Sequence, residues 1–195
     1  MRRRNLCVFA AVMLLWLAAD IATKAVCNGY GLGEVIAGPF LGLVQFRLAH
    51  NTGAAWGMFG DSTFALGVMS LLVCAALAAY LVATARRANL VEVVGIALVV
   101  AGGLGNALDR FTLGYVVDFI DTTFIEFPTF NVADIGVTCG FVLFFAGMLW
   151  GMRRDGLTTA CADAGQPGAA DAADEAAGPS GDVPRTGDAC GPQGR

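Results

Sequence analysis

Two aspartates, Asp118 and Asp134, are the residues of this 195-residue chain best suited to chemistry. They stand 16 residues apart between apolar segments, and Asp118 lies within the apolar frame from Tyr115 to Ile120. If the fold brings the two carboxyls together, their repulsion makes them share one proton near neutral pH. The protonated carboxyl then acts as an acid and the ionised carboxyl as a base, a combination that activates water for attack on an amide.

Helix capping and ion pairing give a second explanation for acids in such a chain. Asp134, or Asn131 three residues earlier, can cap a helix that begins near Ile135. Asp109 can form an ion pair with its neighbour Arg110. Capping does not explain an acid inside an apolar frame, so both interpretations remain open for the set as a whole.

Asp121 competes with Asp118 for a place in a catalytic pair. The sequence from Asp121 to Thr123, Asp-Thr-Thr, resembles the Asp-Thr-Gly of soluble aspartic proteases but lacks the glycine. The residues alone do not choose between the two aspartates.

Metal and nucleophile chemistry have little support in the sequence. The chain has six cysteines without Cys-x-x-Cys spacing, and three of them lie in apolar runs, where a thiol packs as a small hydrophobic group. A single histidine makes a histidine-based metal centre or nucleophile pair improbable. We therefore expect no metal site and no cofactor.

The elements that must position these acids are membrane-spanning helices. Hydrophobic residues make up 56% of the chain and charged residues only 14%, and the mean hydropathy is +0.65. A helix needs roughly 20 apolar residues to cross a bilayer. Four segments meet or approach this length and predict an all-α membrane protein with four transmembrane helices, at about residues 5–27, 62–85, 91–108 and 135–152.

Smaller features complete the predicted organisation. Residues from Leu43 to Ala49 alternate with the period of a strand, which predicts a small extracytoplasmic β-sheet or cradle on the membrane surface. Trp56 and Phe59 in the next stretch suit the headgroup interface. We expect residues 1–154 to form the membrane domain, and residues 155–195, rich in Ala, Gly, Asp and Pro, to form a disordered cytoplasmic tail.

Basic residues predict the orientation of the chain. The two long loops between segments keep few of them, whereas seven arginines gather at the other ends of the segments, at Arg2, Arg3, Arg4, Arg86, Arg87, Arg153 and Arg154. The positive-inside rule places that side in the cytoplasm, so both termini are cytoplasmic and the acid-rich loop is extracytoplasmic. The formal net charge of −4 without a basic stripe argues against nucleic acid as a partner.

Two further features have open interpretations. Asp20 and Lys24 stand four residues apart in the first apolar segment, on one helical face where they can pair. Gly102, Gly103 and Gly105 remove side chains from the third segment, which permits either close helix packing or a slot for an acyl chain.

Taken together and in order, five motifs in residues 6–152 resemble those of lipoprotein signal peptidases, the type II signal peptidases of bacteria. They are D-x-x-T-K at Asp20–Lys24, N-T-G-A-A-W at Asn51–Trp56, G-G-x-G-N-x-x-D-R at Gly102–Arg110, V-V-D-F at Val116–Phe119 and F-N-V-A-D at Phe130–Asp134.

This resemblance implies a four-helix aspartic endopeptidase of the bacterial inner membrane that needs no cofactor. It implies that the enzyme cuts diacylglyceryl-modified prolipoproteins just before the modified cysteine, in contact with membrane lipids. By motif match Asp118 and Asp134 are the catalytic pair, which favours Asp118 over Asp121. The same match marks substrate contacts or supports of the pair at Asn51, Gly102, Asn106, Arg110 and Asn131, and a structural or supporting acid at Asp20.

Two other function classes fit an acid-bearing membrane bundle. In a proton-coupled transporter the acids would relay protons, although transporters place such groups near the bilayer midplane and this chain keeps them at the ends of the segments. In a non-enzymatic assembly factor the acids would serve only as helix caps.

Overall fold

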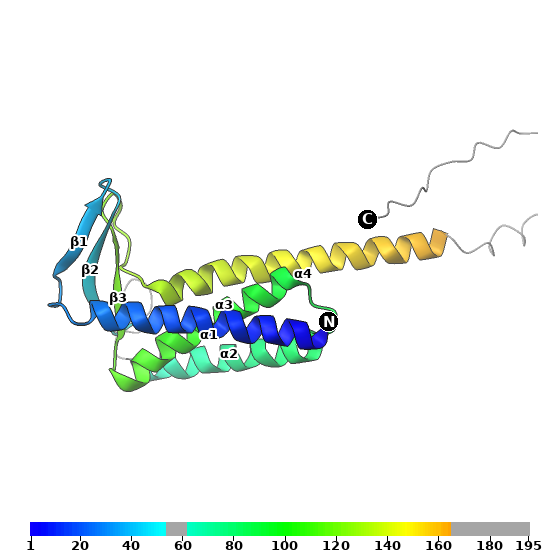
Figure 1. Ribbon diagram of the computed structural model, residues 1–195, viewed down its shortest axis with the longest axis horizontal. Helices are drawn as coiled ribbons and strands as arrows, with labels where there is room; N and C mark the ends of the chain where they lie inside the picture. Colours follow the sequence, from blue (N-terminus) through cyan, green and yellow to red (C-terminus); the bar gives the residue numbers. More distant parts are fainter. Residues whose placement is uncertain (54–61, 165–195) are drawn as a thin grey trace, which may run out of the picture. The chain divides into compact units, whose positions relative to one another are not determined.

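The structure is a computed structural model that describes residues 1–53 and 62–164. Four helices and three strands make up this part of the chain (Figure 1). In chain order they are α1 (Arg2–Cys27), β1 (Val35–Phe40), β2 (Val44–Asn51), α2 (Thr63–Thr84), α3 (Leu90–Thr112), β3 (Val116–Thr122) and α4 (Val132–Ala164).

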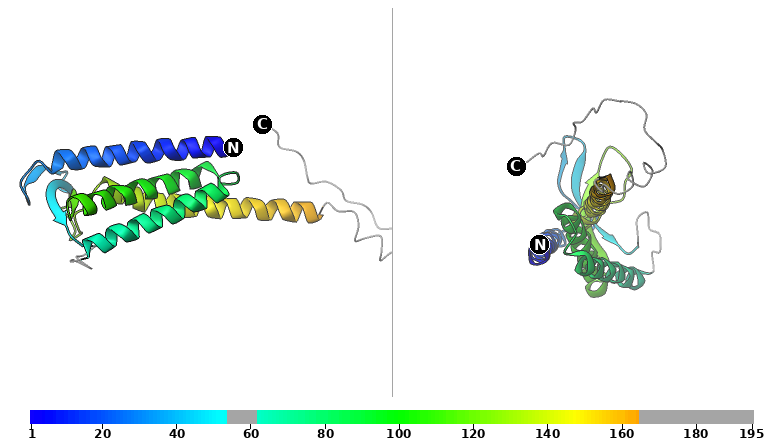
Figure 2. Two further views of the ribbon diagram at one scale, coloured as in Figure 1. Left: turned by 90° about the horizontal axis from the view of Figure 1, so that it is seen from below. Right: turned by 90° about the vertical axis from the view of Figure 1, so that its right-hand side faces the viewer.

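Within the described residues, four helices are long and apolar enough to cross a membrane, as the sequence predicted. Helix α3 lies at the centre of the bundle, packed against α1 and α2 (Figure 2). In its most apolar window 72% of the residues are buried inside the protein, against 6% for α1. Helix α1 therefore leaves most of its apolar surface for lipid, while α3 carries the side chains that the other helices enclose.

Small residues let α3 approach its neighbours closely. A Cβ atom at Gly95 would collide with the backbone of Phe144 on α4, and one at Gly103 would lie 2.5 Å from the Cys74 sulfur on α2. A Cβ at Gly105 would collide with the Asp20 carboxylate on α1. The glycines of α3 thus serve close helix packing, the first of the two roles considered for them.

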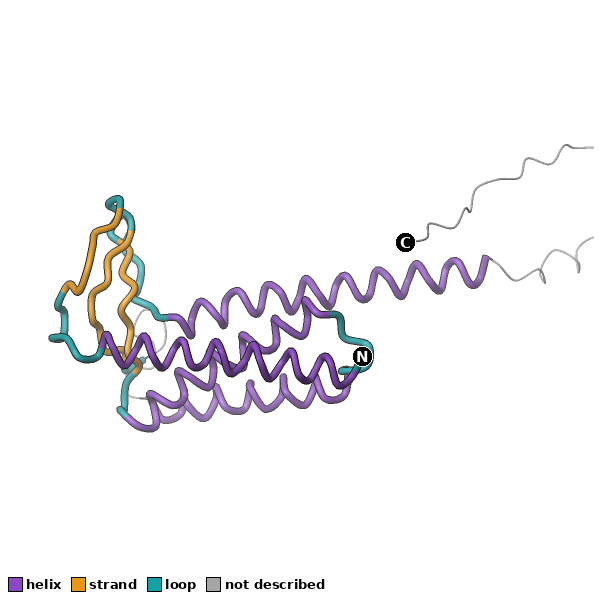
Figure 3. The backbone as a smooth tube through the Cα atoms, viewed as in Figure 1, coloured by secondary structure: helices purple, strands orange, loops and turns teal. Residues whose placement is uncertain are grey.

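The three strands form one antiparallel sheet in the order β1-β2-β3, which confirms the predicted small sheet. It stands across the helix axes at one end of the bundle (Figure 3). The predicted strand at Leu43–Ala49 is the central strand β2. Pairing of β2 with β3 places Ala49 opposite Asp118 and Asn51 opposite Val116, so an amide comes beside the first acid. Trp56 and Phe59, expected at the headgroup interface, lie outside the described residues.

Helix α4 is longer than its predicted apolar span at both ends. It begins at Val132 rather than near residue 135, because its first turn is capped by polar side chains. It also continues to Ala164, ten residues beyond Arg154, into the predicted tail. No proline occurs between Val132 and Ala164, so no residue in the helix forbids helical backbone in this way. Disorder of the tail remains a prediction for residues 165–195, which lie outside the described part.

Candidate active site

Asp118 is a buried carboxyl in the middle of β3, with only 2% of its surface exposed. Its two oxygens accept hydrogen bonds from the side-chain amides of Asn131, at 2.7 Å, and Asn51, at 3.0 Å. Burial and the nearby charge of Asp134 raise the pKa of Asp118 to about 7, against the opposing effect of the two amide donors. Asp118 can therefore hold a proton near neutral pH.

Asp134 lies in the first turn of α4, where it takes part in a reciprocal cap with Asn131. The Asn131 side-chain oxygen accepts the Asp134 N–H at 3.0 Å, and the Asp134 carboxylate accepts the Asn131 N–H at 3.1 Å. The Asn131 carbonyl accepts the Ile135 N–H, so Asn131 is the N-cap residue. The two caps considered from the sequence are present at the same time.

Asn131 links the two acids directly. Its side-chain amide donates to Asp118 while its main-chain N–H donates to Asp134. Its side chain is fully buried, so neither bond competes with bulk water. Asn131 thus brings a carboxyl of β3 and a carboxyl of α4 next to the same residue.

Asn106 on α3 supports the other side of Asp134. Its amide nitrogen donates to an Asp134 oxygen at 2.8 Å, and its amide oxygen accepts from Lys24 on α1 at 2.9 Å. Behind it, the predicted pair of Asp20 and Lys24 is present at 2.9 Å. Lys24 also pairs with Asp109 at 3.0 Å, which corrects the expected pairing of Asp109 with Arg110.

Asp20 and Gly102 act beneath the first turn of α4 and do not line the cavity beside the acids. An Asp20 oxygen accepts the Ala133 N–H at 2.9 Å. A Cβ at Gly102 would collide with the Ala133 carbonyl and lie 2.8 Å from a Val137 methyl group. Both residues therefore determine how close the helix that carries Asp134 comes to α1 and α3.

Asp121, the competitor of Asp118, faces different partners. Its carboxylate accepts hydrogen bonds from Arg47 at 2.8 Å and Gln45 at 2.7 Å. The bond from Arg47 holds the pKa of Asp121 below its ordinary value. An ionised, paired carboxylate of this kind is suited to joining strands, and the structure joins Asp118, not Asp121, to Asp134 through Asn131.

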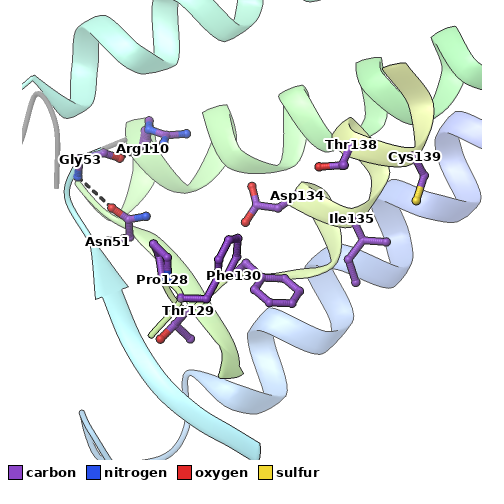
Figure 4. A pocket seen from close by; sticks show the side chains of 11 residues that line it. Asn51, Gly53, Arg110, Pro128, Thr129, Phe130, Asp134, Ile135, Thr138 and Cys139 are labelled. Carbon is purple, nitrogen blue, oxygen red and sulfur yellow. Dashed lines mark hydrogen bonds between the residues drawn. The ribbon is translucent and has the colours of Figure 1, made fainter. Parts of the chain in front are cut away.

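A cavity of about 500 Å³ opens beside Asp134 (Figure 4), and Asp118 lies behind its wall, hydrogen-bonded to the lining residue Asn51. The Asp134 side chain points into it, across from Asn51. Polar groups and apolar groups divide its wall, formed by Asn51, Gly53, Arg110, Phe127, Pro128, Thr129, Phe130, Asp134, Ile135, Thr138 and Cys139. The apolar part of the wall is the larger, and a ligand with a polar backbone and an apolar substituent would match both parts.

Arg110 belongs to the polar part of the cavity wall and has a side-chain donor without a described partner. Its two terminal nitrogens donate to the carbonyls of Asn106, at 3.2 Å, and Gly53, at 3.3 Å. Its Nε is buried and has no partner among the described residues. A planar guanidinium held in this way can donate to a peptide carbonyl or an ester oxygen.

The acids and amides that the sequence singled out lie close together in the structure, whereas the cavity wall was not predicted. Phe127 and Thr138 lie in none of the five motifs, and Phe130 entered only as the first residue of F-N-V-A-D, so only the fold gathers these side chains around one cavity. Asp109 was assigned to a different partner, although its position three residues after Asn106 gave a signal that both face α1. Within the described residues no group of three or more His, Cys, Asp or Glu side chains is arranged to hold a metal ion.

Comparisons with known proteins agree on one family. Residues 12–150 match the family described as signal peptidase (SPase) II. The chain is 34% identical over 134 residues to the lipoprotein signal peptidase of Latilactobacillus sakei subsp. sakei (strain 23K), covering 69% of this chain and 82% of that protein. It is 36% identical over 146 residues to the lipoprotein signal peptidase of Nostoc punctiforme, covering 73% and 89%.

A solved structure has the same fold. It is described as "Bacterial membrane enzyme structure by the in meso method at 2.3 A resolution", and it superposes with a TM-score of 0.66 at 29% identity. The match covers 72% of this chain and 87% of that one.

Proposed function

Because this chain belongs to the signal peptidase II family, we propose that it removes signal peptides from prolipoproteins by an aspartic mechanism carried by Asp118 and Asp134. It is a multi-pass membrane protease. The observation that carries the mechanism is the bridge made by Asn131, which donates to both carboxyls. Nothing in the described residues 1–53 and 62–164 favours a transporter or an assembly factor.

The two acids divide the work according to their surroundings. Asp134 stands at a helix N-terminus, accepts N–H groups from Asn106 and Asn131 and faces the cavity, conditions that favour a carboxylate in contact with water. Asp118 is buried, and its pKa, raised to about 7, lets it keep a proton up to about neutral pH. Asp134 is therefore the base and Asp118 the acid.

Hydrolysis then follows with its protons accounted for. The Asp134 carboxylate takes a proton from a water molecule while the water oxygen bonds to the scissile carbonyl carbon, and Asp118 gives its proton to the carbonyl oxygen. In the resulting diol, Asp134 returns its proton to the amide nitrogen as the C–N bond breaks. Asp118 recovers a proton from the hydroxyl that becomes the new carboxyl, so the pair ends with one proton, as it began.

The cavity suits a lipidated peptide. Asn51 and Arg110 offer donors for main-chain carbonyls or ester oxygens, and the aromatic side chains of Phe127 and Phe130 form an apolar wall. We propose that the cut falls just before the diacylglyceryl-modified cysteine, with the acyl chains on the apolar side and in the surrounding lipid.

The distribution of charge and the place of the sheet support a proposed location and orientation. The N-terminus and the α2–α3 turn, which carry five of the seven clustered arginines, lie at the end of the bundle away from the sheet (Figure 1). With that end in the cytoplasm, the chain lies in the bacterial inner membrane with both termini inside. The two acids then lie near the extracytoplasmic face, where a secreted peptide arrives.

The test is cleavage of a diacylglyceryl-modified prolipoprotein by the purified full-length protein in lipid vesicles. Asp118→Asn and Asp134→Asn should each abolish signal peptide release, because asparagine keeps the shape but cannot exchange the proton. Asp121→Asn is the matched control on the same strand and should retain cleavage. Normal cleavage by either dyad variant would refute the assignment, and a transporter would show no cleavage in any form of the protein.

A further inference from the structure

Lys24 is a buried cation that the proposed reaction does not use. Its side chain is 4% exposed, and its ammonium lies 2.9 Å from an Asp20 oxygen, 3.0 Å from an Asp109 oxygen and 2.9 Å from the amide oxygen of Asn106. An ammonium has three N–H donors and no acceptor. Three oxygens therefore surround three donors, and one of these oxygens belongs to a residue that contacts Asp134.

The contact with Asn106 fixes the orientation of an amide. If the amide turned over, its NH₂ group would face the Lys24 ammonium and its oxygen would face the Asp134 carboxylate, which places like charges together at both ends. The observed orientation instead puts the Asn106 oxygen on Lys24 and the NH₂ group on Asp134, at 2.8 Å. Asn131 also approaches the Asn106 oxygen, at 3.1 Å, but donates more closely to Asp118.

We propose that Lys24 is a positioning residue for the reaction, which acts through Asn106 to hold Asp134 as the ionised member of the pair. The inference rests on the proposed function and adds a residue of α1 to it. Lys24 does not line the cavity beside Asp134, so it contributes through the Asn106 amide rather than by contact with substrate.

Several charged groups gather around this network, and each bears on the expected pH dependence. They come from α1, α3 and β3 and are Asp20, Lys24, Asp109, Arg110 and Asp118.

Removing Lys24 alone would leave two carboxylates of the cluster without their cation, which is costly inside a membrane bundle. A folding defect in that single variant would hide the effect on catalysis.

The double variant Lys24→Met with Asp109→Asn reduces this problem, because only Asp20 then lacks the cation and Asp20 still accepts the Ala133 N–H at 2.9 Å. It removes one positive and one negative charge, so the formal charge of the cluster is unchanged. The new amide at position 109 still offers an oxygen to the Val117 N–H, which donates to Asp109 at 3.1 Å. Glu92→Gln is the matched control, because Glu92 is a buried acid of α3 that bonds Tyr80, away from the site.

The experiment measures kcat and KM for release of the signal peptide as a function of pH, with thermal unfolding of each variant alongside. A hydrogen bond to a charged group is worth about 1.5–3 kcal/mol, so losing the oriented amide should move the acidic limb of kcat upward by about one to two pH units in the double variant. KM should change little, and the acidic limb of Glu92→Gln should stay in place.

A third variant distinguishes an effect of Lys24 through Asn106 from a direct effect of the Lys24 charge on Asp134. In an Asn106→Leu background, the Lys24→Met and Asp109→Asn changes should produce no further shift of the acidic limb, because the link is already broken. The proposal is overturned if the double variant loses thermal stability without moving that limb, since Lys24 would then only tie helices together. An equal shift in the Asn106→Leu background would overturn it too. Cleavage by Asp118→Asn or Asp134→Asn would instead refute the proposed function, so the two failures are distinguishable.

Discussion

Substituting Asn131 separates two roles that one side chain performs. Its oxygen caps α4 and its amide nitrogen donates to Asp118 at 2.7 Å. Serine at this position keeps an oxygen that can cap a helix but has no group that reaches Asp118, whereas alanine loses both functions. Comparing Asn131→Ser with Asn131→Ala therefore isolates the cap, and comparing either with the original protein isolates the bond to the acid.

The size of each effect follows from the contacts. Loss of an N-cap costs about 0.5–2 kcal/mol, so the alanine variant should unfold at a lower temperature than the serine variant. Both variants lose the same donor, and both should lose activity to a similar extent. The lost bond stabilises the ionised form of Asp118, so its removal raises the pKa of Asp118 above about 7. Because the reaction needs this group protonated, the residual activity should persist to higher pH.

The assay is signal peptide release across a pH series, with thermal unfolding of the same samples in detergent. Equal stability of the two variants would show that Asn131 does not cap α4 in solution. An alkaline limb that stays in place, or moves downward, would show that the Asn131 amide does not hold the Asp118 carboxylate. Activity near that of the original protein would contradict the role of Asn131 as the bridge between the acids.

Three other expectations follow from the site. Cleavage by the original protein should decline as pH rises through about 7, because Asp118 loses its proton there; a rate that keeps rising well above that pH would contradict its role as the acid. Gly102→Ala should cost about 1–3 kcal/mol of stability through overpacking, while Gly29→Ala, with only one backbone oxygen at 3.4 Å from the new Cβ, should cost less; equal unfolding temperatures would refute this. Arg110→Lys should raise KM more than it lowers kcat, because lysine lacks the planar fork, and unchanged KM would exclude Arg110 from substrate binding.

Local patterns were enough to predict the helices and the central strand. Apolar segments of this length have few alternatives to a membrane helix, and alternation from Leu43 to Ala49 matched β2. Helix ends were harder. The start of α4 depends on a side-chain cap between Asn131 and Asp134, and its end at Ala164 lies in a stretch whose composition suggested a tail. Propensity alone gives weak guidance at such boundaries.

By itself the sequence determined that the chain lies in a membrane, how many helices span it, and which acids and amides are present for a site. These features depend on the length of apolar segments and on residue type, which are local properties. Only the tertiary structure decided which of these groups meet. It placed Asp118 rather than Asp121 beside Asn131, turned Asp109 toward Lys24, and enclosed a cavity between α4, the sheet and Arg110. These contacts depend on how closely α3 packs against α1 and α4 and on the register between β2 and β3. Both are relations between segments far apart in the chain, so no local sequence pattern encodes them.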